Sequence, residues 1–303
     1  MPVITLTHIQ ECVQQGKWLV LARAISMVEN QVSGYEALLQ ELPSSGGAQV
    51  LGITGPPGAG KSTLVNALLA HLLKNPAHRI GIIAVDPSSP FNMGALLGDR
   101  IRMSDYFLNP RVYIRSLATR GALGGLTARI IEITDVMRHA GFSHILIETV
   151  GVGQSEVEIA GLADHTMLVL VPESGDEVQQ MKSGVMEVAD VYVLNKCDRP
   201  GASVFFKNLL DMLRLSHAGM HKKTAQVSAA LHQGIDELSV LLDTLHNESS
   251  SPDKRAHLIA EKAFEWIRNK RVENLSKESL HSKILEQLKS NQFNFYRFCK
   301  DFV

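Results

Sequence analysis

The sequence predicts an α/β fold, in which a mostly parallel β-sheet is flanked by helices and helical extensions lie at both ends of the chain. Between residues 49 and 246, short runs rich in Val, Ile and Leu alternate with stretches of helical periodicity. This pattern is typical of strands that are buried on both faces of a parallel sheet. The first of these runs leads through a Gly-rich turn directly into a helical pattern. A length of 303 residues allows one large domain with extensions.

The N-terminal region predicts helices. From Thr7 to about Leu42 apolar side chains recur at helical spacing, and Thr7 is a candidate N-cap. The periodic residues are Leu19, Leu21, Ala22, Ile25 and Val28. Residues 43–47 read Pro-Ser-Ser-Gly-Gly, which predicts a linker, so residues 1–43 are assigned to an N-terminal helical extension.

Residues 44–246 are assigned to the α/β domain and contain seven strand candidates. These strands are predicted at 49–54, 79–85, 112–115, 143–149, 166–172, 191–195 and 224–228. After a polar hinge at 247–253, two helices are predicted, from Lys254 to about Asn274 and from Ser279 to about Phe298. Residues 247–303 are therefore assigned to a C-terminal helical arm.

Residues 55–63 read Gly-Pro-Pro-Gly-Ala-Gly-Lys-Ser-Thr, a complete phosphate-binding loop between a strand and a helix. Its glycines let the loop curl, so that several backbone N–H groups surround one phosphate at the helix N-terminus. Lys61 is expected to reach the β- and γ-phosphates, and the Ser62 hydroxyl to ligate Mg²⁺. The nucleotide-binding candidates in this loop are Gly55, Pro56, Pro57, Gly58, Ala59, Gly60, Lys61, Ser62 and Thr63.

Residues 191–198 predict which base the bound nucleotide carries. They form an apolar strand that ends in Asn-Lys-x-Asp. The Asp198 carboxylate can accept hydrogen bonds from guanine N1–H and the N2 amine together, whereas adenine offers no such pair of donors. Asn195 is expected to tie this loop to the phosphate loop, and the stem of Lys196 to cover the base. A Ser-Ala turn follows, whose backbone N–H is expected to contact guanine O6; its residues are Ser228, Ala229 and Ala230. The motifs together predict GTP.

Acidic residues follow two other predicted strands. Asp86 and Glu148 stand at strand ends, and Asp99 follows in a Leu-Gly-Asp-Arg sequence. A carboxylate at a strand end beside a phosphate loop is placed to ligate Mg²⁺ through water. Catalytic and metal roles for all three acids are what the family resemblance described below implies. For Asp86 and Asp99 the ordinary alternatives are to close a turn before Pro and to cap a helix.

Gly151 is where a backbone N–H is expected to sense the γ-phosphate. The next residue is Val152, not a glutamine that could position the attacking water. Unaided hydrolysis of GTP is therefore expected to be slow.

Composition and sequence pattern argue against several classes of protein. Charged residues make up 20% of the chain and the formal net charge is −1, so no overall attraction to nucleic acid or to anionic membranes is expected. No apolar run approaches the ~20 residues of a membrane span, and the N-terminus lacks the pattern of a signal peptide. The three cysteines, Cys12, Cys197 and Cys299, are far apart, which disfavours a disulfide framework or a zinc site. A cytoplasmic protein is expected.

Six motifs occur in an order that resembles one known family. They lie at residues 86–90, 97–103, 120–125, 148–156, 175–182 and 195–198. Over roughly residues 16 to 240 the chain resembles the methylmalonyl-CoA mutase-associated GTPases of the MeaB/ArgK type. The resemblance implies a homodimer in which GTP binding and hydrolysis gate the loading of adenosylcobalamin into a cobalamin-dependent acyl-CoA mutase. Methylmalonyl-CoA mutase is the favoured partner.

The resemblance also assigns three switch segments, at residues 86–103, 148–154 and 175–184. In the third, switch III, the candidate residues are Asp176, Gln179 and Lys182. The chain departs from the family pattern at Asn92, Met93, Ala122, Gln180 and Ser183, and its C-terminal part matches poorly. These departures leave the nucleotide residues intact and bear on partner coupling.

Other functions are alternatives for the same fold. A metal-delivery GTPase would need metal ligands near the switches, and the twelve histidines are scattered without a His-rich tract. A signal-recognition GTPase would carry a Met-rich helical domain, and the ten methionines are dispersed. Older naming of the resembled family leaves a GTPase-fold kinase or regulator of a lysine/arginine/ornithine transport system as the second candidate. A protein kinase is disfavoured because the sequence has no His-Arg-Asp catalytic loop.

Overall fold

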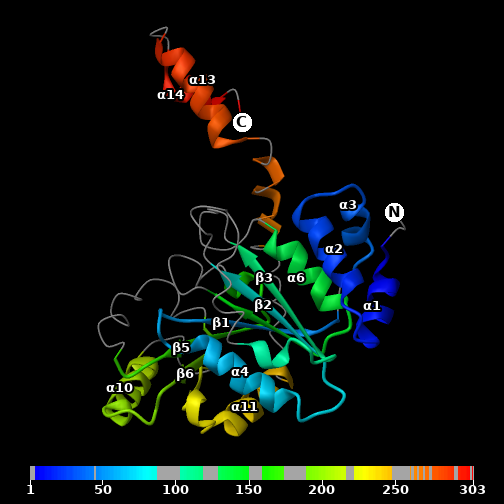
Figure 1. Cartoon of the computed structure of the whole chain (residues 1–303). Coiled ribbons are helices and arrows are strands. Elements are labelled where there is room, and N and C mark those ends of the chain that lie inside the picture. Colours follow the sequence, from blue (N-terminus) through cyan, green and yellow to red (C-terminus); the bar gives the residue numbers. More distant parts are fainter. Residues whose placement is uncertain are drawn as a thin grey trace. The chain divides into compact units, whose positions relative to one another are not determined.

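The computed structural model describes residues 4–43, 46–86, 103–118, 129–149, 159–173, 189–215, 222–247, 260, 263–264, 266–268, 270–272, 275–289, 293–300 and 302. The chain divides into two compact units, Met1–Ile259 and Ala260–Val303. Figure 1 shows the elements of each unit.

The larger unit is built on a parallel sheet, whose strands are drawn as arrows in Figure 1. The strands are β1 Gln49–Thr54, β2 Ile80–Asp86, β3 Val112–Ala118, β4 His144–Glu148, β5 His165–Leu170, β6 Val191–Leu194 and β7 Lys223–Gln226. Their order across the sheet is β3-β2-β4-β1-β5-β6-β7, and every pairing is parallel. All seven predicted strands are present in the described part of the chain. Their ends differ from the prediction by at most three residues, as at β3, which was expected to end at 115.

Helices cover both faces of this sheet. They are α1 Leu6–Gln14, α2 Leu19–Glu29, α3 Tyr35–Gln40, α4 Lys61–Leu72, α6 Ile130–His139, α10 Ala202–Leu215 and α11 Ile235–Asn247, with 3₁₀ turns η1 Ser104–Tyr106, η2 Ile159–Gly161 and η4 Ala229–Leu231. The prediction that Thr7 caps the first helix is wrong, because Thr7 lies inside α1. Thr5 has the extended backbone of an N-cap, and its hydroxyl accepts a hydrogen bond from the backbone N–H of His8 at 3.3 Å.

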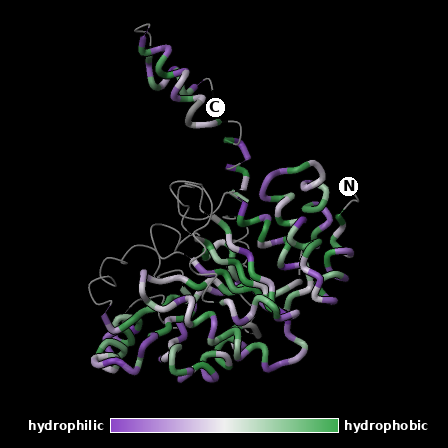
Figure 2. The backbone as a smooth tube through the Cα atoms, viewed as in Figure 1, coloured by the Kyte–Doolittle hydropathy of each residue, from purple (hydrophilic) through white to green (hydrophobic). Residues whose placement is uncertain are grey.

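Alternate residues along the central strands enter different hydrophobic clusters. In β4, Ile145 and Ile147 pack with α1, α2, α3 and α6, whereas Leu146 packs on the other face with α4 and α11. A third cluster forms under α10 around the fully buried Tyr192. Figure 2 shows the hydrophobic colour gathered along the strands. Burial on both faces explains why the strands read as continuous apolar runs.

The N-terminal helices belong to this packed unit. An ion pair joins Arg115 of β3 to Glu29 at the end of α2. Arg79 donates from Nη2 to the carbonyl oxygen of Gln14 at the end of α1, at 2.6 Å. The segment predicted as an extension thus completes the cover of one sheet face.

The smaller unit contains α13 Lys277–Lys289 and α14 Phe295–Lys300. The single helix predicted from Ser279 to about Phe298 is wrong, because a new helix begins after Asn294. The Asn294 side chain accepts a hydrogen bond from the backbone N–H of Arg297 at 3.1 Å, which is an N-cap contact. The buried Phe298 then packs near the rings of Phe293 and Phe302. Within the described part of the chain, no helix has the length and apolar character needed to cross a membrane.

Candidate nucleotide-binding site

Those predicted site residues that the structure describes lie at one edge of the sheet, at the carboxyl ends of the strands. The phosphate loop follows β1, the Asn-Lys-x-Asp loop follows β6, and Glu148 ends β4. The strand β1 lies between β4 and β5, and the chain proceeds from it to β2 on one side and later to β5 and β6 on the other. Ligands of open α/β sheets bind at such a switch point.

The phosphate loop has the backbone that its glycines predict. Gly55 has φ +144° and Gly60 has φ +84°. A Cβ on Gly55 would lie 2.2 Å from the carbonyl oxygen of Val169, and one on Gly60 would lie 2.5 Å from Nδ2 of Asn195. Only glycine fits these positions, and α4 begins immediately afterwards at Lys61. The N-terminus of α4 therefore faces the loop, as anion binding requires.

The Lys61 ammonium lies over this loop. It donates to the carbonyl oxygens of Gly55 at 2.8 Å and of Pro56 at 3.0 Å, and the residue is 6% exposed. A buried cation is thus held where the phosphates of a nucleotide would carry negative charge.

Ser62 and Glu148 form the second polar centre. The Ser62 hydroxyl donates to Oε1 of Glu148 at 2.6 Å, and both residues are buried. A hydroxyl and a carboxylate are oxygen donors of the kind that Mg²⁺ prefers, so this pair fits the predicted magnesium site. The described residues contain no cluster of three or more His, Cys, Asp or Glu suited to a metal.

Asn195 joins the base loop to the phosphate loop. Its Nδ2 donates to the carbonyl oxygen of Ala59 at 2.8 Å, as the sequence led us to expect. Its Oδ1 accepts from the backbone N–H groups of Lys196 at 2.8 Å and Ala229 at 3.1 Å. This buried amide therefore holds three segments together. The Ala229 N–H, one candidate donor to guanine O6, is used by Asn195.

Lys196 spans the same two loops. It has φ +56°, which is uncommon for a residue with a side chain, and its Nζ donates to the carbonyl oxygen of Gly58 at 2.7 Å. The side chain therefore runs from the base loop to the phosphate loop, over the space between them.

Asp198 is exposed at the end of the base loop. A hydrogen bond from the Ser228 hydroxyl holds the pKa of Asp198 below its ordinary value, and the charges of Arg199 and Lys196 lower that pKa further. The carboxylate is therefore ionised at neutral pH, and its two oxygens have the capacity to accept further hydrogen bonds beside the one from Ser228. Sequence reasoning placed Ser228 in the site without foreseeing this contact.

Several predicted residues lie outside the described part of the chain. They are Asp99, Gly151, Val152, Asp176, Gln179 and Lys182, together with the family departures Asn92, Met93, Ala122, Gln180 and Ser183. Asp86 is the last residue of β2, and its side chain is not described.

The sequence reasoning missed an ion pair beside the base loop. Arg199 Nη1 lies 2.5 Å from Oε1 of Glu173, which follows β5. The hydrogen bond from Arg199 lowers the pKa of Glu173 below its ordinary value. The sequence carried no signal for this pair, because only the pairing of β5 with β6, with Leu170 opposite Leu194, brings the two charges together.

The sheet, the phosphate loop and the Asn-Lys-x-Asp loop together define the class of protein: a P-loop GTPase. Comparison with known proteins assigns the chain to a family within this class. Residues 21–284 match the family described as methylmalonyl Co-A mutase-associated GTPase MeaB, and the chain belongs to this family.

Individual relatives agree with the family. A Pyrococcus abyssi protein classed as a GTPase is 43% identical over 234 residues, which is 75% of this chain and 72% of that protein. The GTPase ArgK of Escherichia coli is 33% identical over 282 residues, 89% of this chain and 85% of that protein. In three relatives from Pyrococcus and Mycobacterium the match spans 72%, 63% and 59% of their own length. A crystal structure described as a LAO/AO transport system kinase shares the fold, with TM-score 0.68 and 24% identity over 100% of this chain and 97% of that one.

Proposed function

We propose that this protein binds GTP with Mg²⁺ and hydrolyses it to GDP and phosphate. The observation that carries the proposal is the Asn195 amide, which holds the phosphate loop through Ala59 and the base-binding turn through Ala229. One buried side chain thus fixes the spacing between the part that would hold phosphate and the part that would read the base.

The described residues include groups suited to bind the phosphates and Mg²⁺. The backbone N–H groups of the phosphate loop and the Lys61 ammonium bind the phosphates, so that negative charge meets positive charge in a largely buried place. Ser62 and Glu148 hold Mg²⁺, to which Asp86 and Asp99 are proposed to contribute. When bound, this ion neutralises charge on the β- and γ-phosphates.

Base selection is assigned to Asp198. Its carboxylate accepts from guanine N1–H and N2, while Ser228 holds it from the protein side. The proposed nucleotide contacts also include Lys196, and Ala230 and Gly151 through backbone N–H groups.

The proposed role of the hydrolysis cycle is to act on a partner. The family name associates its members with methylmalonyl Co-A mutase. We propose that this chain, as a cytoplasmic homodimer, gates the loading of adenosylcobalamin into such an acyl-CoA mutase. Switch III, with Asp176, Gln179 and Lys182, is proposed as the coupling segment on the strength of the sequence resemblance.

Steady-state release of phosphate from GTP, with and without saturating methylmalonyl-CoA mutase, tests this role. Slow release by the protein alone and faster release with the mutase are expected. The variant Lys182→Ala should keep its basal rate and lose most of the stimulation. A mutase that leaves the wild-type rate unchanged would contradict the partner role and leave GTP hydrolysis standing.

A second candidate is a kinase of a transport system, as the crystal structure of the same fold is described. Transfer of label from the γ-phosphate of GTP to a protein separates the two functions. The proposed hydrolase releases all label as free phosphate, whereas a kinase places it on its protein substrate.

A further inference from the structure

The ion pair of Glu173 and Arg199 has no part in the function proposed so far. Its side chains are 53% and 47% exposed, and pairs of this kind contribute little to stability. The pair lies, however, directly beside the residue assigned to the base, because Arg199 follows Asp198 in the chain.

Backbone hydrogen bonds hold the chain that leads to Arg199. The backbone N–H of Asn195 donates to the carbonyl oxygen of Leu170 at 2.8 Å, which joins the ends of β6 and β5. A turn then follows, in which the backbone N–H of Arg199 donates to the carbonyl oxygen of Lys196 at 3.0 Å. The Arg199 side chain starts from this turn, and its guanidinium reaches Glu173.

One carboxylate binds that guanidinium, and a second belongs to the neighbouring residue in the chain. Glu173 holds it at 2.5 Å, and Asp198 is the preceding residue, on whose pKa the charge of Arg199 already acts. A guanidinium is always charged and binds carboxylates through two parallel hydrogen bonds. If Arg199 bound Asp198 in this way, it would occupy the acceptors that guanine N1–H and N2 require.

We propose that Glu173 is a positioning residue for guanine recognition, which holds the Arg199 guanidinium away from Asp198 and keeps that carboxylate available to the base. This inference rests on the proposed function, in which Asp198 reads guanine. Glu173 then determines specificity without touching the nucleotide.

The test is a set of three variants of the whole chain: Glu173→Gln, Arg199→Ala and the double variant. Dissociation constants are measured for GDP and for IDP, whose base lacks the N2 amine. We expect Glu173→Gln to weaken GDP binding about threefold to fivefold, the upper part of the range for an exposed charge pair, and to reduce the preference for GDP over IDP. Arg199→Ala should bind both nucleotides like the wild type, and the double variant should recover wild-type affinity and preference.

A matched control is Asp211→Asn on α10, which removes the carboxylate from another exposed pair, with Arg214 at 3.5 Å. It should bind GDP like the wild type. The proposal is overturned if Glu173→Gln binds GDP normally, if the double variant stays as weak as Glu173→Gln, or if all three variants lose affinity equally. Failure of the proposed function has another signature, because the wild type itself would then bind GDP no better than ADP.

Discussion

At the scale of single residues, the site depends on side chains that satisfy several backbone groups at once. The Asn195 side chain forms hydrogen bonds with backbone groups of Ala59, Lys196 and Ala229. Its removal would leave buried polar groups without a hydrogen-bond partner. The free-energy penalty of a buried polar group without a partner exceeds the net stabilisation from one hydrogen bond. We therefore expect Asn195 to influence the proposed site without having to touch the nucleotide.

We predict that Asn195→Ala destabilises the protein by about 1–3 kcal/mol, because buried donors and acceptors lose their partner. GDP affinity should fall as well, since the two loops lose their fixed spacing. Urea denaturation and GDP titration measure the two effects. The control Asn30→Ala removes an exposed amide that donates to Ser26 at 2.8 Å, and it should change neither by a comparable amount. An Asn195→Ala midpoint equal to that of the wild type would refute the argument.

Lys61 and Glu148 should differ in what they control. Lys61→Ala is predicted to weaken GDP binding and turnover together, because the ammonium meets the phosphates in ground and transition states alike. Glu148→Ala should spare GDP binding more than turnover, because its effect passes through Mg²⁺. Single-turnover rates and GDP dissociation constants separate these outcomes. Equal losses of GDP affinity in both variants would contradict this division of roles.

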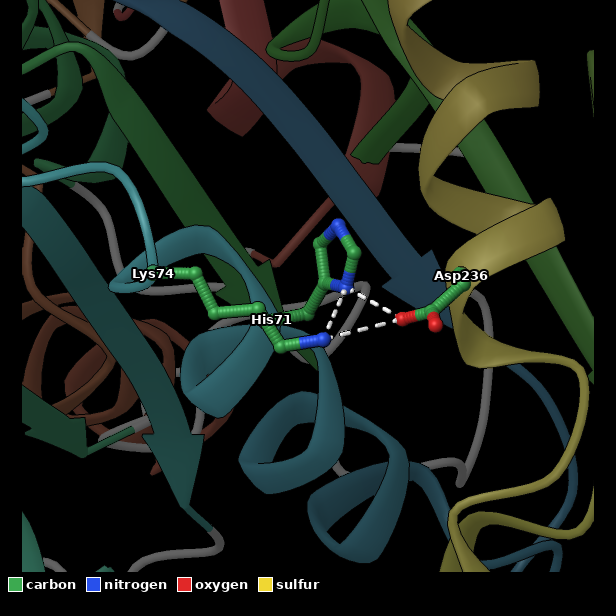
Figure 3. Close-up of polar contacts among 3 residues, drawn as sticks. All are labelled: His71, Lys74 and Asp236. Carbon is green, nitrogen blue, oxygen red and sulfur yellow. Dashed lines mark hydrogen bonds and ion pairs between the residues drawn. The ribbon is translucent and has the colours of Figure 1, made fainter.

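At the scale of elements, the helix that follows the phosphate loop is tied to the helix that follows the base-binding turn. Figure 3 shows His71, in the last turn of α4, and Lys74, two residues after that helix ends, meeting Asp236 in the first turn of α11. Oδ1 of Asp236 lies 2.6 Å from His71 Nδ1 and 3.1 Å from Lys74 Nζ. The carboxylate lies at a helix N-terminus and the basic groups at a helix C-terminus, so each also complements a helix dipole.

The hydrogen bonds from Lys74 and then His71 hold the pKa of Asp236 below its ordinary value of 3.8. A depressed folded-state pKa gives stability that is present above the unfolded pKa and is lost as the pH falls through the folded one. Asp236→Asn should therefore have a lower urea midpoint than the wild type at pH 7, and the difference should shrink below about pH 4. Because Asp236 is exposed, the difference is expected to be small. Glu237→Gln in the same turn is the control, and an Asp236→Asn difference that persists unchanged at pH 3 would contradict the argument.

The elements also show where sequence reasoning succeeds. The strands were predictable because burial on both faces leaves a continuous apolar run, as in β6. The helix boundaries were less predictable from the sequence, because a helix cap depends on local hydrogen bonds. Thr5 rather than Thr7 caps α1, and Asn294 starts a helix inside a segment whose periodicity reads as continuous.

At the scale of the whole molecule, the site joins residues from distant parts of the chain. The phosphate and base loops were predictable as motifs because glycine geometry and guanine chemistry restrict which residues serve. The Glu173–Arg199 pair was not, because neither residue belongs to a motif and only the β5–β6 pairing brings the two together. The chain forms two compact units. The family match supports the proposal that the protein acts on a mutase.

The most direct test of the central claim is a competition titration of Asp198→Asn with GTP and xanthosine triphosphate. The amide presents a donor to guanine N1–H and N2, which are donors themselves, but it suits the C2 oxygen of xanthine. The account predicts a sharp loss of GTP affinity and a gain of affinity for xanthosine triphosphate. An unchanged preference for GTP would show that Asp198 does not read the base.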